Sequence, residues 1–349
     1  MFAAESKAVP ATVNSSPSTT ACSWKEIIGP VEPFLEQVHE RLLGQVDTFD
    51  PKIAPYADYA INGQGKHLRP ALVALTANAL GRRTEAHVTV AVIIEMVHLA
   101  TLVHDDVMDD AEIRRGQLTL AANWGNEIAV LFGDCLFAQA LKLAASFPTP
   151  EICRAVAAAT NTVCSGEILQ TQHRHDFQLT REKYFKVLEM KTAELFALCC
   201  DLSACLSGAS EKRRSALRQF GLAFGTAYQV YDDCVDLFGS EALAGKSLGT
   251  DVAKGKLTLP VLLMLERATP ADRERLQGIV QGWHNGAMER LGEMLARYET
   301  LGASLDIVHQ YLERSRQILK ELPETSGRLA LAGLTEYLAG QTDALGVCA

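Results

Sequence analysis

Apolar residues recur along this chain at helical spacing, and from Trp24 onward almost no segment alternates in the manner of a β-strand. Three long runs are apolar on several faces, which predicts buried central helices. They are residues 86–108, 126–146 and 217–237. Glycine and proline clusters separate such runs, as between residues 239 and 255. From about residue 271 the pattern becomes more charged and more regularly amphipathic, which predicts outer helices. The chain is therefore predicted to form one all-α domain over residues 23–349.

The first 22 residues differ from this pattern, because they are rich in Ser, Thr, Pro and Ala and contain neither arginine nor an apolar signal core. They predict a disordered tail at residues 1–22. No uninterrupted apolar stretch reaches the length that a membrane helix needs, so we expect no transmembrane segment. The nine cysteines form no Cys-x-x-Cys pair. An odd count without a framework indicates a reducing compartment, and we expect a cytoplasmic protein.

The balance of charge excludes one class of partner. The formal net charge is −9, and nucleic acids or anionic membranes require a basic surface, so we expect no nucleic-acid partner. If the ligand of this acidic chain is itself an anion, cationic groups must lie between the two.

The end of the first long run carries a cluster of carboxylates. Asp105 and Asp109 lie four residues apart, so on a helix they share one face, with Asp106 beside them. Like charges in this arrangement destabilise an isolated helix, and the negative end of the helix dipole adds to the cost. A solvated surface could tolerate such a cluster, whereas a position beside apolar residues requires a cation.

The same spacing recurs at the end of the third long run, in Asp232, Asp233 and Asp236. Hard oxygen ligands of this kind suit Mg²⁺, which keeps several waters and is held by one or two carboxylates together with substrate phosphates. Two such clusters that face each other predict a site that clamps one diphosphate through metal ions.

Cationic residues that could bind such an anion directly lie in short clusters beside glycines. Arginine can bind phosphate through two parallel hydrogen bonds, and lysine acts as a point charge. Each cluster alone is weak evidence, so their positions relative to the aspartates carry the weight. The clusters are Lys66 with Arg69, Arg114 with Arg115, Lys246, and Lys254 with Lys256.

Together these residues resemble the polyprenyl synthetase family of trans-isoprenyl diphosphate synthases, from about residue 30 to residue 335. The matching motifs are Gly65-Lys66-x-x-Arg69-Pro70, the first aspartate motif with Arg114-Arg115-Gly116, Gly166-Glu167, Lys191-Thr192-Ala193, Gln229-x-x-Asp232-Asp233-x-x-Asp236, and Gly249-Thr250-Asp251 with Gly255-Lys256-x-x-Leu259-Pro260. So many spaced matches make the resemblance specific. It implies an all-α isoprenoid-synthase helical bundle with a central substrate cavity, usually as a homodimer.

The resemblance also implies a reaction, in which an allylic diphosphate is condensed head to tail with isopentenyl diphosphate to give a longer all-trans polyprenyl diphosphate. The implied ligands of three Mg²⁺ ions are Asp105, Asp109 and Asp232, supported by Asp106, Asp233 and Asp236. The implied partners of the allylic diphosphate are Arg114, Lys191, Lys246 and Lys256. Those of isopentenyl diphosphate are Lys66, Arg69, His98 and Arg115. Thr192 and Gln229 would line the reacting centre.

Product length depends on the residues below the first aspartate motif. Going down the helix from Asp105, the same face carries Thr101 and Ala100, then Val97. In the family, bulky aromatics just before this motif form a floor that stops elongation at farnesyl length. Ala100 and Thr101 are small, which predicts a long-chain product. Geranylgeranyl diphosphate is the alternative, because a floor could lie on the next helix, for instance at Phe132 or Phe137.

Three other readings account for fewer residues. A class I terpene synthase typically pairs one aspartate motif with an Asn/Ser/Glu motif, whereas both motifs here are aspartate-rich. A di-iron carboxylate bundle would use the Glu-x-x-His pairs at residues 36–39 and 95–98, but it leaves both aspartate motifs unexplained. A catalytically silent partner subunit would be expected to lose motif aspartates, and none is missing.

Overall fold

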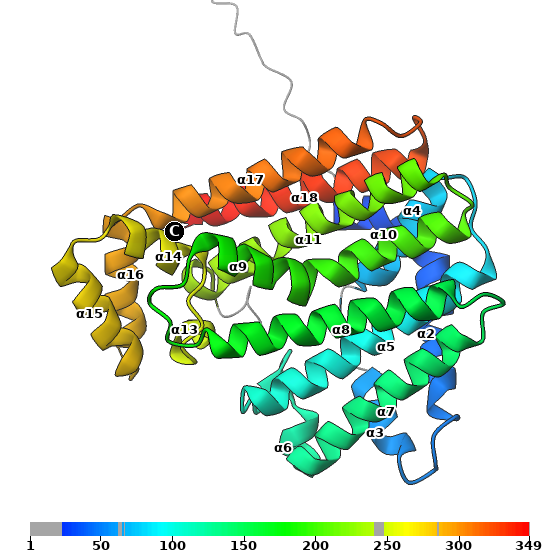
Figure 1. The fold of residues 1–349 in the computed structure, drawn as a ribbon, viewed down its shortest axis with the longest axis horizontal. Coiled ribbons are helices and arrows are strands. Elements are labelled where there is room, and N and C mark those ends of the chain that lie inside the picture. Colours follow the sequence, from blue (N-terminus) through cyan, green and yellow to red (C-terminus); the bar gives the residue numbers. More distant parts are fainter. Residues whose placement is uncertain (1–22, 62–64, 66, 241–247, 285, 349) are drawn as a thin grey trace, which may run out of the picture.

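The computed structural model describes residues 23–61, 65, 67–240, 248–284 and 286–348, and within these ranges nearly all regular structure is helical (Figure 1). The predicted all-α fold is confirmed. Lys66, Lys246 and the tail predicted at residues 1–22 lie outside the described residues. The elements up to the middle of the chain are α1 (Trp24–Ile28), η1 (Gly29–Val31), α2 (Glu32–Val46), α3 (Ala54–Ile61), α4 (Leu68–Ala79), α5 (Glu85–Met108), β1 (Ile113–Arg114), β2 (Gln117–Leu118), α6 (Leu120–Trp124), α7 (Asn126–Ala145) and α8 (Glu151–Gln172).

The second half of the chain continues in helices only, within the described residues. Its elements are α9 (Arg181–Leu188), η2 (Glu189–Ala193), α10 (Glu194–Leu206), α11 (Glu211–Phe238), α13 (Thr250–Ala253), α14 (Leu259–Arg267), α15 (Pro270–Gln281), α16 (Ala287–Arg297), α17 (Thr300–Leu319) and α18 (Ser326–Cys348).

The two short strands pair antiparallel, with Ile113 opposite Leu118, and form a small hairpin directly after α5. In Figure 1, α15 and α16 form the end of the molecule away from this core, as the amphipathic pattern predicted.

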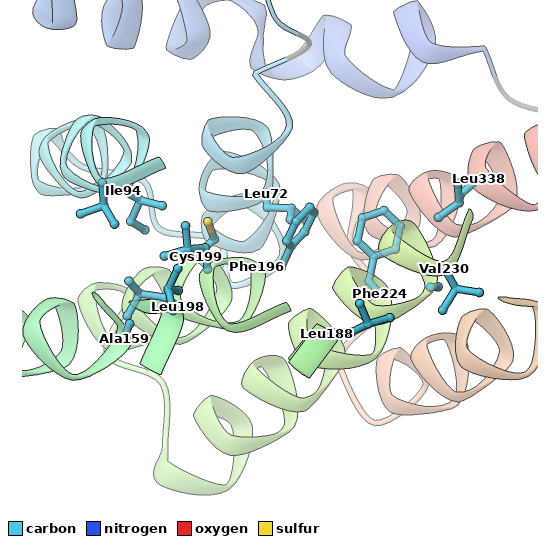
Figure 2. Close-up of a cluster of buried hydrophobic side chains, with 14 of the residues drawn as sticks. Leu72, Ile94, Ala159, Leu188, Phe196, Leu198, Cys199, Phe224, Val230 and Leu338 are labelled. Atoms are coloured by element: carbon cyan, nitrogen blue, oxygen red, sulfur yellow. The ribbon is translucent and has the colours of Figure 1, made fainter. Parts of the chain in front are cut away.

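Of the three runs predicted to be buried, α5 and α11 lie in the core, whereas α7 keeps an exposed side on which Leu131 is 61% exposed. Helices α4 and α10 complete the core. Helix α5 packs against α2, α4, α7 and α10, and α10 in turn packs against α8 and α11. Their side chains interdigitate in Figure 2, where Phe196 of α10 lies near Phe224 of α11, and the ring centroids are 6.0 Å apart. A Cβ on Gly221 would lie 2.6 Å from Ala197 Cα, so glycine is what permits the close approach of α11 to α10.

The expectation that no apolar stretch reaches the length of a membrane helix was wrong. By length and composition alone, α5 and α7 are each long and apolar enough to cross a membrane. In α5, however, 61% of the apolar window is buried inside the fold, whereas in α7 the figure is 39%. A helix that is buried on several sides has to be apolar all round, so a core helix such as α5 resembles a membrane helix in composition.

Candidate active site

A cavity of about 780 Å³ opens between α5, α7, α8, the η2–α10 segment, α11 and the residues around α13. Its lining combines the aspartates of both motifs with apolar side chains of α5, α7 and α8. The apolar residues include Val107, Met108, Val130, Phe137, Val163 and Ile168.

The first aspartate motif divides its side chains between the cavity and the protein. Asp105 and Asp109 line the cavity, as their shared helix face predicted. Asp106 is buried, and its Oδ1 accepts a hydrogen bond from Arg114 Nε at 2.7 Å. Neither Asp106 nor Arg114 is among the residues that line the cavity, and the predicted contact of Arg114 with the allylic diphosphate stays a prediction.

The second motif is divided in the same way. Asp232 and Asp233 line the cavity, whereas Asp236 is buried outside the lining. The Asp236 carboxylate accepts hydrogen bonds from Thr250 Oγ1 at 3.0 Å and from the Asp251 backbone amide at 3.3 Å. These bonds hold the start of α13 against α11. As a result Asp251, which was not among the predicted site residues, also lines the cavity.

Asp233 is the end of a buried chain of hydrogen bonds. Tyr184 OH donates to Asp233 Oδ2 at 2.5 Å, and Gln229 Nε2 donates to Oδ1 at 2.9 Å. Thr192 Oγ1 donates to Gln229 Oε1 at 2.9 Å, so the predicted pair Thr192 and Gln229 is brought together. Burial raises the pKa of Asp233 to about 8, with the charge of Asp251 acting in the same direction.

Lys191 and Thr192 lie in a single turn of π-helix, η2, inserted between α9 and α10. Such turns widen a helix locally and are frequent at functional sites. The widened turn packs directly against α8, where a Cβ on Gly166 would lie 2.7 Å from the Lys191 backbone nitrogen. Lys191 Nζ donates to Gln170 Oε1 at 2.9 Å, forms an ion pair with Glu167, and lies 3.6 Å from Asp105 Oδ2.

Cations from three further positions surround Asp109. Lys256 Nζ lies 2.7 Å from Asp109 Oδ2, Lys254 Nζ lies 3.7 Å from it, and Arg174 Nη2 donates to Oδ1 at 3.0 Å. Burial raises the pKa of Asp109, but these lysines outweigh it and the net shift is downward. For Asp105, burial dominates over the charge of Lys191 and raises the pKa to about 6.

The residues predicted for isopentenyl diphosphate form a second polar group, on the side of the cavity next to α4. Arg69, His98 and Arg115 all line the cavity. The guanidinium of Arg69 stacks over the Phe196 ring at 4.8 Å, and burial together with the charges of Arg69 and Arg115 holds the pKa of His98 well below its usual range. A Cβ on Gly65 would lie 2.7 Å from Arg115 Nη1, so the Arg115 guanidinium packs closely over this glycine.

The predicted chain-length residues fall on both sides of the cavity wall. Thr101 lines the cavity, whereas Ala100 and Val97 are fully buried in the packing of α5 and do not. Of the two aromatic residues considered on the next helix, Phe137 lines the cavity. Phe132 is buried and packs against Phe49, with ring centroids 6.1 Å apart.

The described lining is richer in carboxyl groups than in cations. Six carboxyl groups face four cationic side chains, which are Asp105, Asp109, Glu167, Asp232, Asp233 and Asp251 against Arg69, Arg115, Lys191 and Lys256. No three imidazole, thiol or carboxyl groups of the described residues converge closely enough to hold a metal alone. Hard, spaced carboxylates fit Mg²⁺, which completes its octahedron with water and phosphate oxygens.

Several residues of the site were missed from the sequence. Gln170 and Asp251 line the cavity, whereas Tyr184 and Arg174 donate hydrogen bonds to its aspartates Asp233 and Asp109. They give no local signal, because they are ordinary residues that tertiary packing brings to the site. Asp251 alone could have been found, since it directly follows Gly249-Thr250 in one of the matching motifs.

The chain matches the polyprenyl synthetase family over residues 50–297. It is 33% identical over 307 residues to the octaprenyl diphosphate synthase of Escherichia coli (strain K12), covering 88% of this chain and 95% of that protein. It is 37% identical over 286 residues to the nonaprenyl diphosphate synthase of Mycobacterium tuberculosis, covering 80% and 84%. The fold is similar to the crystal structure of a decaprenyl diphosphate synthase from Rhodobacter capsulatus, with a TM-score of 0.86, 29% identity and coverage of 92% and 99%.

Proposed function

The chain belongs to the polyprenyl synthetase family and is a prenyltransferase, and we propose that it condenses an allylic diphosphate with isopentenyl diphosphate to make a long-chain all-trans polyprenyl diphosphate. One observation carries the proposal. A single cavity combines a lining rich in carboxylates, which needs metal cations before it can accept an anion, with apolar side chains of α5, α7 and α8 that fit a hydrocarbon chain. A diphosphate ester of a prenyl alcohol has these two parts.

We propose Mg²⁺ as the cofactor, held by Asp105 and Asp109 on one side and by Asp232 and Asp251 on the other. Bound Mg²⁺ would act as a Lewis acid that stabilises the charge growing on a departing diphosphate. Three ions per site remain a prediction. Asp106 and Asp236 support this arrangement from behind, through Arg114 and through the start of α13.

The basic residues divide the two diphosphates between them. Lys191 and Lys256 lie beside the aspartates and would bind the allylic diphosphate. Arg69 and Arg115 would bind isopentenyl diphosphate on the opposite side of the cavity, with neutral His98 beside them. Since Lys66 and Lys246 lie outside the described residues, their predicted roles in the two pockets remain proposals.

The reaction follows from this division. The allylic C–O bond breaks, the isopentenyl double bond forms a new C–C bond to the allylic carbon, and a proton leaves to the released diphosphate. The hydroxyl of Thr192 and the amide of Gln229 lie where the two substrates meet, and their hydrogen bond fixes their orientation. The apolar walls exclude water, which would otherwise capture the cation.

The experiment that tests the proposal uses purified enzyme with farnesyl diphosphate, excess isopentenyl diphosphate and Mg²⁺, followed by mass spectrometry of the products. We expect a series of extended diphosphates that ends well beyond geranylgeranyl. Products that stop at geranylgeranyl would support the alternative product. No incorporation of isopentenyl diphosphate at all would contradict the proposed reaction.

We also propose that the protein acts as a homodimer in the cytoplasm. Helix α7 exposes apolar side chains, including Val130 at 41% and Leu131 at 61% exposure, which is what a self-association surface presents. The cytoplasmic location is supported by the cysteines of the described residues, which carry free thiols.

A further inference from the structure

His104 directly precedes Asp105 in α5 and forms part of the cavity wall. Its imidazole lines the cavity together with Phe137 of α7, and the two ring centroids are 5.6 Å apart. Nε2 lies 3.0 Å from the backbone oxygen of Val130 and 3.6 Å from Asp134 Oδ1. Because a carbonyl oxygen only accepts, Nε2 donates the proton. The ring is therefore anchored to α7, although it belongs to α5.

The ring fits there because Gly133 has no side chain. A Cβ on Gly133 would lie 2.2 Å from His104 Nε2, 2.5 Å from Cδ2 and 2.9 Å from Cε1, all within distances that real Cβ atoms do not show. Glycine is a poor helix former compared with alanine. Its presence in the middle of α7 therefore has a local reason, which is the recess that receives the imidazole.

We propose that Gly133 is a specificity-determining residue, because this recess keeps the His104 ring out of the channel along which the prenyl chain grows. The inference rests on the proposed chain elongation. A side chain at position 133 would force the ring to move. Helices α5 and α7 pack along their length, and Phe137 blocks the deeper side, so the ring would swing into the cavity.

The position of the ring explains why the effect would fall on product length. A chain that grows away from Asp105 passes Thr101, one helical turn or about 6 Å deeper. His104 lies three residues after Thr101 and so borders the same stretch of the cavity, and both residues line it. A ring displaced into this stretch would leave room for the allylic substrate at the metal site but would obstruct the units added later.

The test compares product lengths of wild type, Gly133→Ala and the double variant Gly133→Ala/His104→Ala, each with farnesyl diphosphate, isopentenyl diphosphate and Mg²⁺. Gly133→Ala should shift the main product shorter by at least one isoprene unit, and removal of the imidazole in the double variant should restore or exceed the wild-type length. The matched control is Gly292→Ala in α16, where an added Cβ would meet nothing within 4 Å, and its products should equal those of wild type.

Two results would overturn the inference while the wild type still elongates its substrate. One is an unchanged product distribution in Gly133→Ala. The other is a double variant whose products are as short as those of Gly133→Ala, since the imidazole would then not be the obstruction. If Gly133→Ala does not fold, His104→Trp tests the same recess, because the larger indole cannot be held against Gly133 and should shorten the product. An unchanged product length in His104→Trp would refute the role of this recess. Failure of wild type to incorporate isopentenyl diphosphate would instead contradict the proposed function.

Discussion

The aspartates of the two motifs look equivalent in the sequence but differ in what their oxygens contact. Asp105, Asp109 and Asp232 line the cavity, whereas Asp236 is 1% exposed and bonds to Thr250 and Asp251. A carboxylate that accepts buried hydrogen bonds stabilises the fold, and one that faces the cavity can bind metal. The two roles predict different consequences of the same substitution.

Asp232→Asn should lower kcat by at least about a hundredfold, because the cavity loses a charged ligand proposed to hold the Mg²⁺ that stabilises the departing diphosphate. The midpoint of thermal unfolding should change little. Asp236→Asn should instead lower the free energy of unfolding by about 1–3 kcal/mol, since its buried partners lose a charged acceptor. Turnover with Mg²⁺ and thermal unfolding followed by circular dichroism measure both effects. Similar unfolding midpoints for the two variants would contradict the assignment of Asp236.

Tyr184→Phe tests the buried chain that ends at Asp233. Without the hydroxyl, Asp233 Oδ2 loses its 2.5 Å hydrogen bond, so the orientation of Gln229 becomes less well fixed. We expect kcat to fall by about tenfold with little change in the KM values, as for an interaction that matters most in the transition state.

The matched control is Tyr298→Phe, which removes a 2.6 Å hydrogen bond to Asp272 between α15 and the end of α16, away from the cavity. It should leave kcat unchanged. A loss of activity of equal size in both tyrosine variants would indicate a general effect on folding and would argue against positioning by Tyr184.

The two diphosphate pockets can be separated with two more variants. Arg69→Ala should raise the KM for isopentenyl diphosphate by about tenfold or more, because a charge-assisted contact is lost. Lys191→Ala should raise the KM for the allylic diphosphate in the same way. Initial rates measured with each substrate varied in turn give both values. Equal effects on both substrates in both variants would show that the pockets are not distinct.

At the residue scale the sequence predicted which side chains gather but not which way each of them points. Spacing placed Asp105 and Asp109 on one helix face, and both line the cavity. The same reasoning put Ala100 beside Thr101, but only Thr101 lines it, because neighbouring residues on a helix differ by about 100° in direction. Which of the two residues faces the cavity depends on the helices that surround α5, and local spacing does not specify those.

At the scale of elements, the long apolar runs predicted the core helices, but nothing predicted the π-turn η2. It interrupts one continuous helical stretch from α9 to α10, and its residues Glu189–Ala193 contain no glycine or proline that would mark an irregularity. The turn depends on packing against α8 at Gly166. Its effect is to present Lys191 and Thr192 together toward the cavity.

Gly166→Ala tests this element. The new Cβ would lie 2.7 Å from the Lys191 backbone nitrogen, and backbone cannot give way as a flexible side chain can. The turn would have to move, and Lys191 with it. We expect at least a tenfold loss of kcat/KM for the allylic diphosphate, although alanine is the better helix former. Gly302→Ala in α17, where an added Cβ meets nothing within 4 Å, provides the control. Wild-type kinetics for Gly166→Ala would refute the dependence of the site on this contact.

At the scale of the whole molecule, the helices around the cavity are unevenly covered. Helix α5 packs against five others, which are α2, α4, α6, α7 and α10, whereas in α7 less than half of the apolar window is buried. The exposed apolar side chains Val130, Leu131 and Ile168 lie on α7 and α8. Val130 and Ile168 also line the cavity, so this face and the prenyl channel share part of one wall.

A charged substitution on this face tests the proposed homodimer. In a two-fold symmetric dimer the same patch of both chains meets, so an introduced charge is brought close to its own copy and repels it. The doubly charged variant Leu131→Asp/Val130→Asp should therefore run as a monomer in size-exclusion chromatography with light scattering, where wild type runs at twice the chain mass. Leu329→Asp is the control, because Leu329 is 65% exposed and belongs to α18, a helix that lies away from α7 in Figure 1. That variant should remain dimeric. A wild-type protein that is monomeric at all concentrations would refute the dimer, and a dimer unaffected by the double variant would place its interface on another face.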